Sequence, residues 1–107
     1  MKLTNLIKLL TIATLALTAT FAQADDRLTC EEFGTIATDI MTARQNNANI
    51  MNVMKIYDDH KDADKIKALV ALSYQKKAYK TAIYQQREIS DFANSMMLAC
   101  YKVRAKQ

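Results

Sequence analysis

Proline and tryptophan are absent from this 107-residue chain, and glycine and histidine each occur once. Without proline, and with Gly34 as its one glycine, the chain lacks the residues that usually form tight hairpins and turns. His60 has no second histidine, no nearby glutamate and no nucleophile motif with which to build a triad or a zinc site. The composition therefore predicts helices and argues against an enzyme.

One segment has the alternation of a calcium-binding loop. Its candidate ligands are Asp58, His60, Asp62 and Asp64. The sixth position, where such a loop needs glycine, is Ala63, and the twelfth, where it needs a bidentate glutamate, is Leu69. We interpret the segment as a solvated turn with helix-capping carboxylates, and we expect no metal and no cofactor.

The first 24 residues have the pattern of a secretory signal. Lys2 and Lys8 precede an uncharged stretch over 9–24, which ends in the small-x-small motif Ala22-Gln23-Ala24. A membrane anchor is the alternative, but these sixteen residues are short of the roughly 20 that a span needs. We predict a cleavable signal peptide over 1–24, a periplasmic protein without stable membrane insertion, and a single helical domain over 25–107.

Cys30 and Cys100 are the two cysteines, and they stand near the two ends of the predicted domain. An even cysteine count in an exported chain is typical of disulfide bonding. Free thiols or a redox pair are the alternatives, but redox thiols usually form a Cys-x-x-Cys motif. We predict one structural disulfide.

Apolar residues recur at helical spacing in four segments of the chain. The first begins at a capping box formed by Thr29 and Glu32 and ends at the asparagine-rich stretch 46–49. The second covers 50–57, and the third follows Asp62, a plausible N-cap. A short connection near 76–80 and a second possible cap, Thr81, precede the fourth. The fold class is thus predicted as all-α: a small four-helix bundle closed by one disulfide that joins the first and last helices.

Charge is distributed unevenly along the predicted domain. Residues 25–64 hold nine acidic and four basic side chains, whereas residues 65–107 hold two acidic and nine basic ones. The two halves can pair within the fold, or the basic half can face an acidic partner or anionic lipid. Nucleic acid is not expected as a partner, because the chain carries an export signal and no recognition motif.

Tyrosines and lysines interleave in the basic half, at Tyr74, Tyr79, Tyr84 and Tyr101 and at Lys76, Lys77, Lys80 and Lys102. This mixture is typical of an interaction surface. Arg44 and Gln45 could add a recognition pair, although a basic residue in a last helical turn also neutralises carbonyl groups. The candidate partner-binding residues are Arg44, Gln45, Tyr74, Lys76, Lys77, Tyr79 and Lys80.

Two resemblances follow from the residues. The layout resembles a family of small exported helical two-cysteine proteins of unassigned function from proteobacteria and their phages, on Cys30, Ile36-Ala37, Ile40-Met41, Ala43-Arg44-Gln45, Leu69-Val70, Tyr74, Tyr79, Thr81, Asp91-Phe92 and Cys100. That family tends to have a proline near Lys77 and a glycine near Asn47, and this chain has neither. The segment Thr29-Cys30-Glu31-Glu32-Phe33 is also similar to the start of HdeA-type periplasmic acid-stress chaperones.

These patterns predict a small periplasmic, non-enzymatic binding protein whose partner is another envelope protein. The alternative is an acid-stress chaperone. Below the usual carboxylate pKa values near 4, the predicted domain loses all 11 negative charges, and its side-chain charge rises from +2 to +13. Self-repulsion would then loosen the bundle and expose apolar surface to client proteins.

The disulfide gives a stability prediction. Closing a loop as long as the one between Cys30 and Cys100 contributes roughly 4 to 5 kcal/mol in the chain-entropy model. Reduction should therefore remove most of the stability of this small domain, as measured by thermal unfolding followed by circular dichroism. A reduced protein with an unchanged unfolding midpoint would contradict a structural disulfide.

Overall fold

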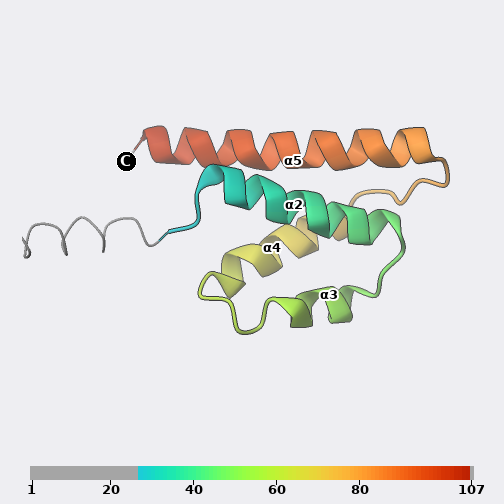
Figure 1. Ribbon diagram of the computed structural model, residues 1–107, viewed down its shortest axis with the longest axis horizontal. Helices are drawn as coiled ribbons and strands as arrows, with labels where there is room; N and C mark the ends of the chain where they lie inside the picture. The colour runs from blue at the N-terminus through green and yellow to red at the C-terminus, as the bar shows by residue number, and fades with distance from the viewer. Residues whose placement is uncertain (1–26, 107) are drawn as a thin grey trace, which may run out of the picture.

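The computed structural model describes residues 27–106, and these residues form α-helices and no strand. The helices are α2 (Cys30–Gln45), α3 (Ile50–Ile56), α4 (Ala63–Tyr74) and α5 (Ala82–Ala105) (Figure 1). The prediction of an all-α fold with four helices is confirmed. The predicted signal peptide, residues 1–24, lies outside the described residues. None of the described helices is both long and apolar enough to cross a membrane.

Helix α2 is the centre of the arrangement. Helix α5 runs antiparallel along one side of it, α4 packs on a different side, and the short α3 lies against α4 (Figure 1). Each helix contributes apolar side chains to one core, whose buried members are Ala37, Ile40, Met41, Val53, Ile66, Leu69, Val70, Ile89 and Phe92. Because α2 is covered from two sides, α4 and α5 do not need to pack closely on each other.

The disulfide joins Cys30 in the first turn of α2 to Cys100 near the end of α5, with the two Cα atoms 5.6 Å apart. This confirms the predicted closure of the first helix on the last. Two hydrogen bonds reinforce it: the Tyr101 hydroxyl donates to the Glu31 carboxylate, and the Arg104 guanidinium donates to the Leu28 carbonyl. We call this group of contacts the closing cluster.

The predicted capping box is present at the start of α2. The Thr29 hydroxyl accepts a hydrogen bond from the Glu32 amide (3.0 Å), and the Glu32 carboxylate accepts one from the Thr29 amide (3.1 Å). Asp62 and Thr81 occupy the N-cap positions of α4 and α5, but neither side chain makes a capping hydrogen bond. Instead, the backbone amide of Asp62 donates a hydrogen bond to Nδ1 of the His60 ring (3.0 Å).

Asn47 allows the chain to turn between α2 and α3. Its φ of 58° lies in the left-handed region, which asparagine tolerates better than most residues. The next helix is capped by Asn49, whose side-chain oxygen accepts from the Met51 amide (2.8 Å).

Gly34 serves close packing and does not form a turn. It lies buried in α2, and a Cβ atom at this position would lie 2.6 Å from the Met97 sulfur of α5. That separation is far below van der Waals contact, so any side chain here would displace Met97. The absent Cβ therefore leaves room for the Met97 side chain of α5 against α2.

Candidate partner-binding surface

The connection between α4 and α5, residues 75–81, has no regular structure, and Gln45 holds it from the end of α2. Only 2% of Gln45 is exposed. Its amide nitrogen donates to the Lys77 carbonyl (2.8 Å), and its amide oxygen accepts from the Tyr79 amide (2.8 Å). One side chain thus satisfies two backbone groups of a segment that lacks a hydrogen-bonding ladder of its own.

Arg44 supports the same connection one residue earlier. Its Nε donates to the Lys76 carbonyl (2.9 Å), and its guanidinium lies 5.1 Å from the centre of the Tyr74 ring. The Tyr74 hydroxyl in turn donates to the Ala48 carbonyl (2.6 Å), and burial raises the pKa of this phenol. These contacts tie the ends of α2 and α4 together.

Helix α5 completes the support from the other side. The Gln85 side chain donates to the Tyr79 carbonyl (2.7 Å), and the ring centres of Tyr79 and Tyr84 are 5.7 Å apart. The backbone at Tyr79 is therefore fixed through both its amide and its carbonyl, by side chains from α2 and α5.

Cationic and aromatic groups project outward from this fixed connection. The Lys77 ammonium lies 5.3 Å from the centre of the Tyr79 ring, and the Arg87 guanidinium lies 5.5 Å from that of Tyr84. Ile83 is 72% exposed beside them. We call this region the Tyr/Lys surface; it consists of Lys76, Lys77, Tyr79, Lys80, Ile83, Tyr84 and Arg87. A shallow hollow of about 350 Å³ lies within it.

The structure brings the seven candidate residues from the sequence together at one end of the molecule. Lys76, Lys77 and Lys80 are exposed, and Tyr79 is half-buried. The other three, Arg44, Gln45 and Tyr74, make the supporting contacts described above, so their side chains position the surface from inside.

Sequence reasoning missed Ile83 and Arg87 because they lie outside the core-facing stripe of α5. The available signal was Ile83 itself, an apolar residue that does not fit the apolar spacing of the last helix.

In the segment that resembles a calcium loop, two of the candidate ligands, Asp58 and His60, make contacts within the protein. Asp58 forms an ion pair with Lys67 of α4 (2.6 Å), and His60 accepts the Asp62 amide. Within residues 27–106, no group of three or more His, Cys, Asp or Glu side chains lies close enough to hold a metal ion. The ion pair links the acidic and basic halves, but both partners are partly exposed, so it contributes little stability.

Comparisons of the chain with models of known protein families, with curated proteins and with solved structures find no match.

The role of Gln45 can be tested by substitution. Gln45→Ala leaves the Lys77 carbonyl and the Tyr79 amide without their partner, and we expect it to lower the free energy of unfolding by about 2 to 3 kcal/mol. Urea denaturation measures this loss, and hydrogen exchange at the Tyr79 amide should accelerate. Gln86→Ala, at an exposed position on α5, is the control and should change stability by less than about 0.5 kcal/mol. Unchanged exchange at Tyr79 would contradict the supporting role.

Proposed function

We propose that this chain is an exported, non-enzymatic binding protein of the periplasm, and that its Tyr/Lys surface binds an acidic envelope protein. The observation that carries the proposal is the double hydrogen bond of Gln45 to the connection 75–81. A segment without regular structure is held in one conformation while its lysine side chains stay in solvent. Such pre-organisation reduces the ordering cost of association.

The composition of the surface supports the same proposal. Tyrosine and arginine are enriched at protein interfaces, and Tyr79, Tyr84 and Arg87 lie next to one another here. Exposed lysines around them favour an acidic partner, since complementary charge speeds association and selects against basic partners. The exposed Ile83 beside them adds apolar surface, and removing this surface from water would favour association.

The proposal predicts that binding depends on the position of the lysines and not only on the net charge. Lys77→Ala with Lys80→Ala should weaken binding to the acidic partner by about tenfold, which corresponds to about 1.4 kcal/mol. Lys102→Ala with Lys106→Ala removes the same charge from the far end of α5, about 30 Å away, and is the matched control. Surface plasmon resonance with a partner captured from periplasmic extract measures both. Equal losses in the two variants would contradict a localised site.

An acid-stress chaperone is the second candidate, and the closing cluster favours it. The hydrogen bond from Tyr101 lowers the pKa of Glu31, and the hydrogen bonds of the capping box lower the pKa of Glu32. A carboxyl whose pKa is lowered in the folded state stabilises the fold above its unfolded pKa. That stabilisation is lost as the pH falls through the folded pKa. Acid therefore weakens the contacts around the disulfide, while the disulfide itself remains.

This candidate predicts chaperone activity only at low pH. Light scattering of an acid-denatured client at pH values of about 2 to 3, below the carboxylate range, should decrease when the protein is added. Tyr101→Phe removes the hydrogen bond to Glu31, so its effect on stability should be largest at neutral pH and should shrink as the pH falls. If the protein does not suppress scattering in acid, the chaperone candidate is wrong.

A further inference from the structure

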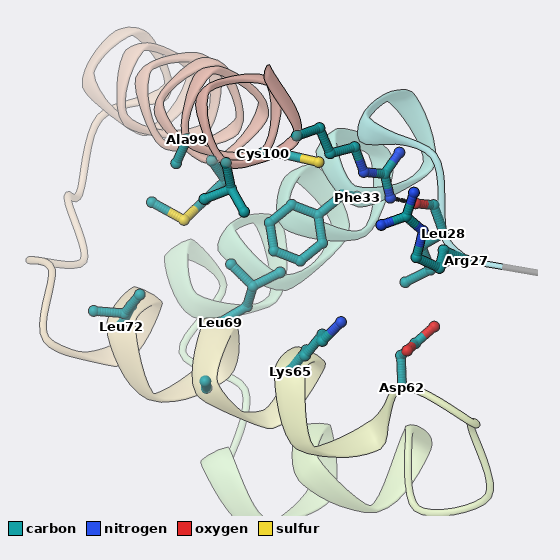
Figure 2. A pocket seen from close by; sticks show the side chains of 13 residues that line it. Arg27, Leu28, Phe33, Asp62, Lys65, Leu69, Leu72, Ala99 and Cys100 are labelled. Atoms are coloured by element: carbon teal, nitrogen blue, oxygen red, sulfur yellow. Dashed lines mark hydrogen bonds between the residues drawn. The ribbon is translucent and has the colours of Figure 1, made fainter. Parts of the chain in front are cut away.

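A groove separates α4 from α5 next to the closing cluster (Figure 2). It lies near the start of α2, whereas the Tyr/Lys surface lies near the end of that helix. Its volume is about 360 Å³, within the range of roughly 300 to 1,000 Å³ that is usual for small-molecule sites. Phe33 of α2 and Leu69 of α4 lie along it, and α5 contributes Met96, Ala99 and Val103.

Apolar side chains line this groove and are incompletely covered. Leu72 is 44% exposed and Val103 is 59% exposed. Ala68 and Ala99, which face the groove from opposite helices, are also exposed, and their small side chains leave the space open. Covering this surface would remove apolar area from water, which favours an apolar occupant.

Charge is concentrated at one end of the groove. Figure 2 shows Arg27 and Lys65 at this end, and Leu72 and Ala99 at the other. Arg104 also lines it, near enough to Glu31 and Glu32 to lower their pKa values, and Asp62 is the carboxylate among the lining residues. The lining residues thus hold three cationic groups and one anionic group.

We propose that this groove binds a free fatty acid with one medium-length acyl chain, with the carboxylate at the end formed by Arg27, Lys65 and Arg104. An acyl chain has no polar groups, so it suits walls that offer no hydrogen-bond partners between Phe33 and Leu72. An extended peptide would leave its backbone amides unpaired there.

The test uses the disulfide-bonded protein purified from the periplasmic fraction, with dodecanoate below its micelle concentration as the probe. Isothermal titration calorimetry should show saturable binding with one site per chain. Dodecyltrimethylammonium has the same chain with a cationic head and should bind at least about tenfold more weakly. Absence of saturable dodecanoate binding, or equal binding of the two probes, overturns the proposal.

Matched variants locate the site. Ala68→Leu fills the groove from α4 and should weaken dodecanoate binding by about tenfold or more, whereas Ala71→Leu, exposed on the same helix outside the groove, should change it by less than about twofold. Asp62→Asn removes the opposing charge and should strengthen binding. Equal losses in the two leucine variants overturn the proposal.

Two further measurements complete the test. Sedimentation of the protein without probe should show a species that Ala68→Leu does not alter. If Ala68→Leu instead dissociates a dimer, the groove is a self-association surface and the proposal is wrong. Ala68→Leu should also leave binding at the Tyr/Lys surface unchanged, because the groove and that surface share no residue. Failure of one proposal is thus distinguishable from failure of the other.

Discussion

The closing cluster is the constraint on which the rest of the structure depends. The Cys30–Cys100 disulfide fixes the start of α2 beside the end of α5, and Tyr101 and Arg104 add hydrogen bonds to the segment around it. From that end, α2 and α5 pack along each other in antiparallel orientation, and Gly34 leaves room for the Met97 side chain between them. The other end of α2 is thereby brought beside the start of α5.

Both candidate sites follow from this antiparallel pair. At the end of the molecule away from the disulfide, Gln45 in the last turn of α2 hydrogen-bonds to the connection 75–81 and fixes its backbone. At the closed end, α4 packs on α2 while α5 packs on a different side of it, and the groove lies between them. One end of the molecule therefore presents the cationic and aromatic side chains of the Tyr/Lys surface. The other end presents the apolar groove, with cationic side chains at one end of it.

The two sites differ in what acid would do to them. The Tyr/Lys surface is supported by neutral amide and carbonyl groups, and its supporting hydrogen bonds do not titrate. The groove adjoins Glu31 and Glu32, whose pKa values are lowered by contacts that protonation removes. An acidic environment would thus weaken the contacts of Glu31 and Glu32 beside the groove. The binding function that we propose and the chaperone alternative would therefore depend on different ends of the same scaffold.

The sequence by itself determined the helices, the capping box at Thr29 and the disulfide, because these depend on local hydrogen bonding, on apolar spacing and on a single possible cysteine pair. It also grouped Lys76, Lys77, Tyr79 and Lys80 of the Tyr/Lys surface, but it missed Ile83 and Arg87 and could not separate the exposed lysines from the buried Gln45. Only the tertiary structure decided that difference, because burial depends on which helix covers a residue. The groove could not be predicted either, since Val103 continues the apolar stripe of α5 but lines the groove and remains largely exposed.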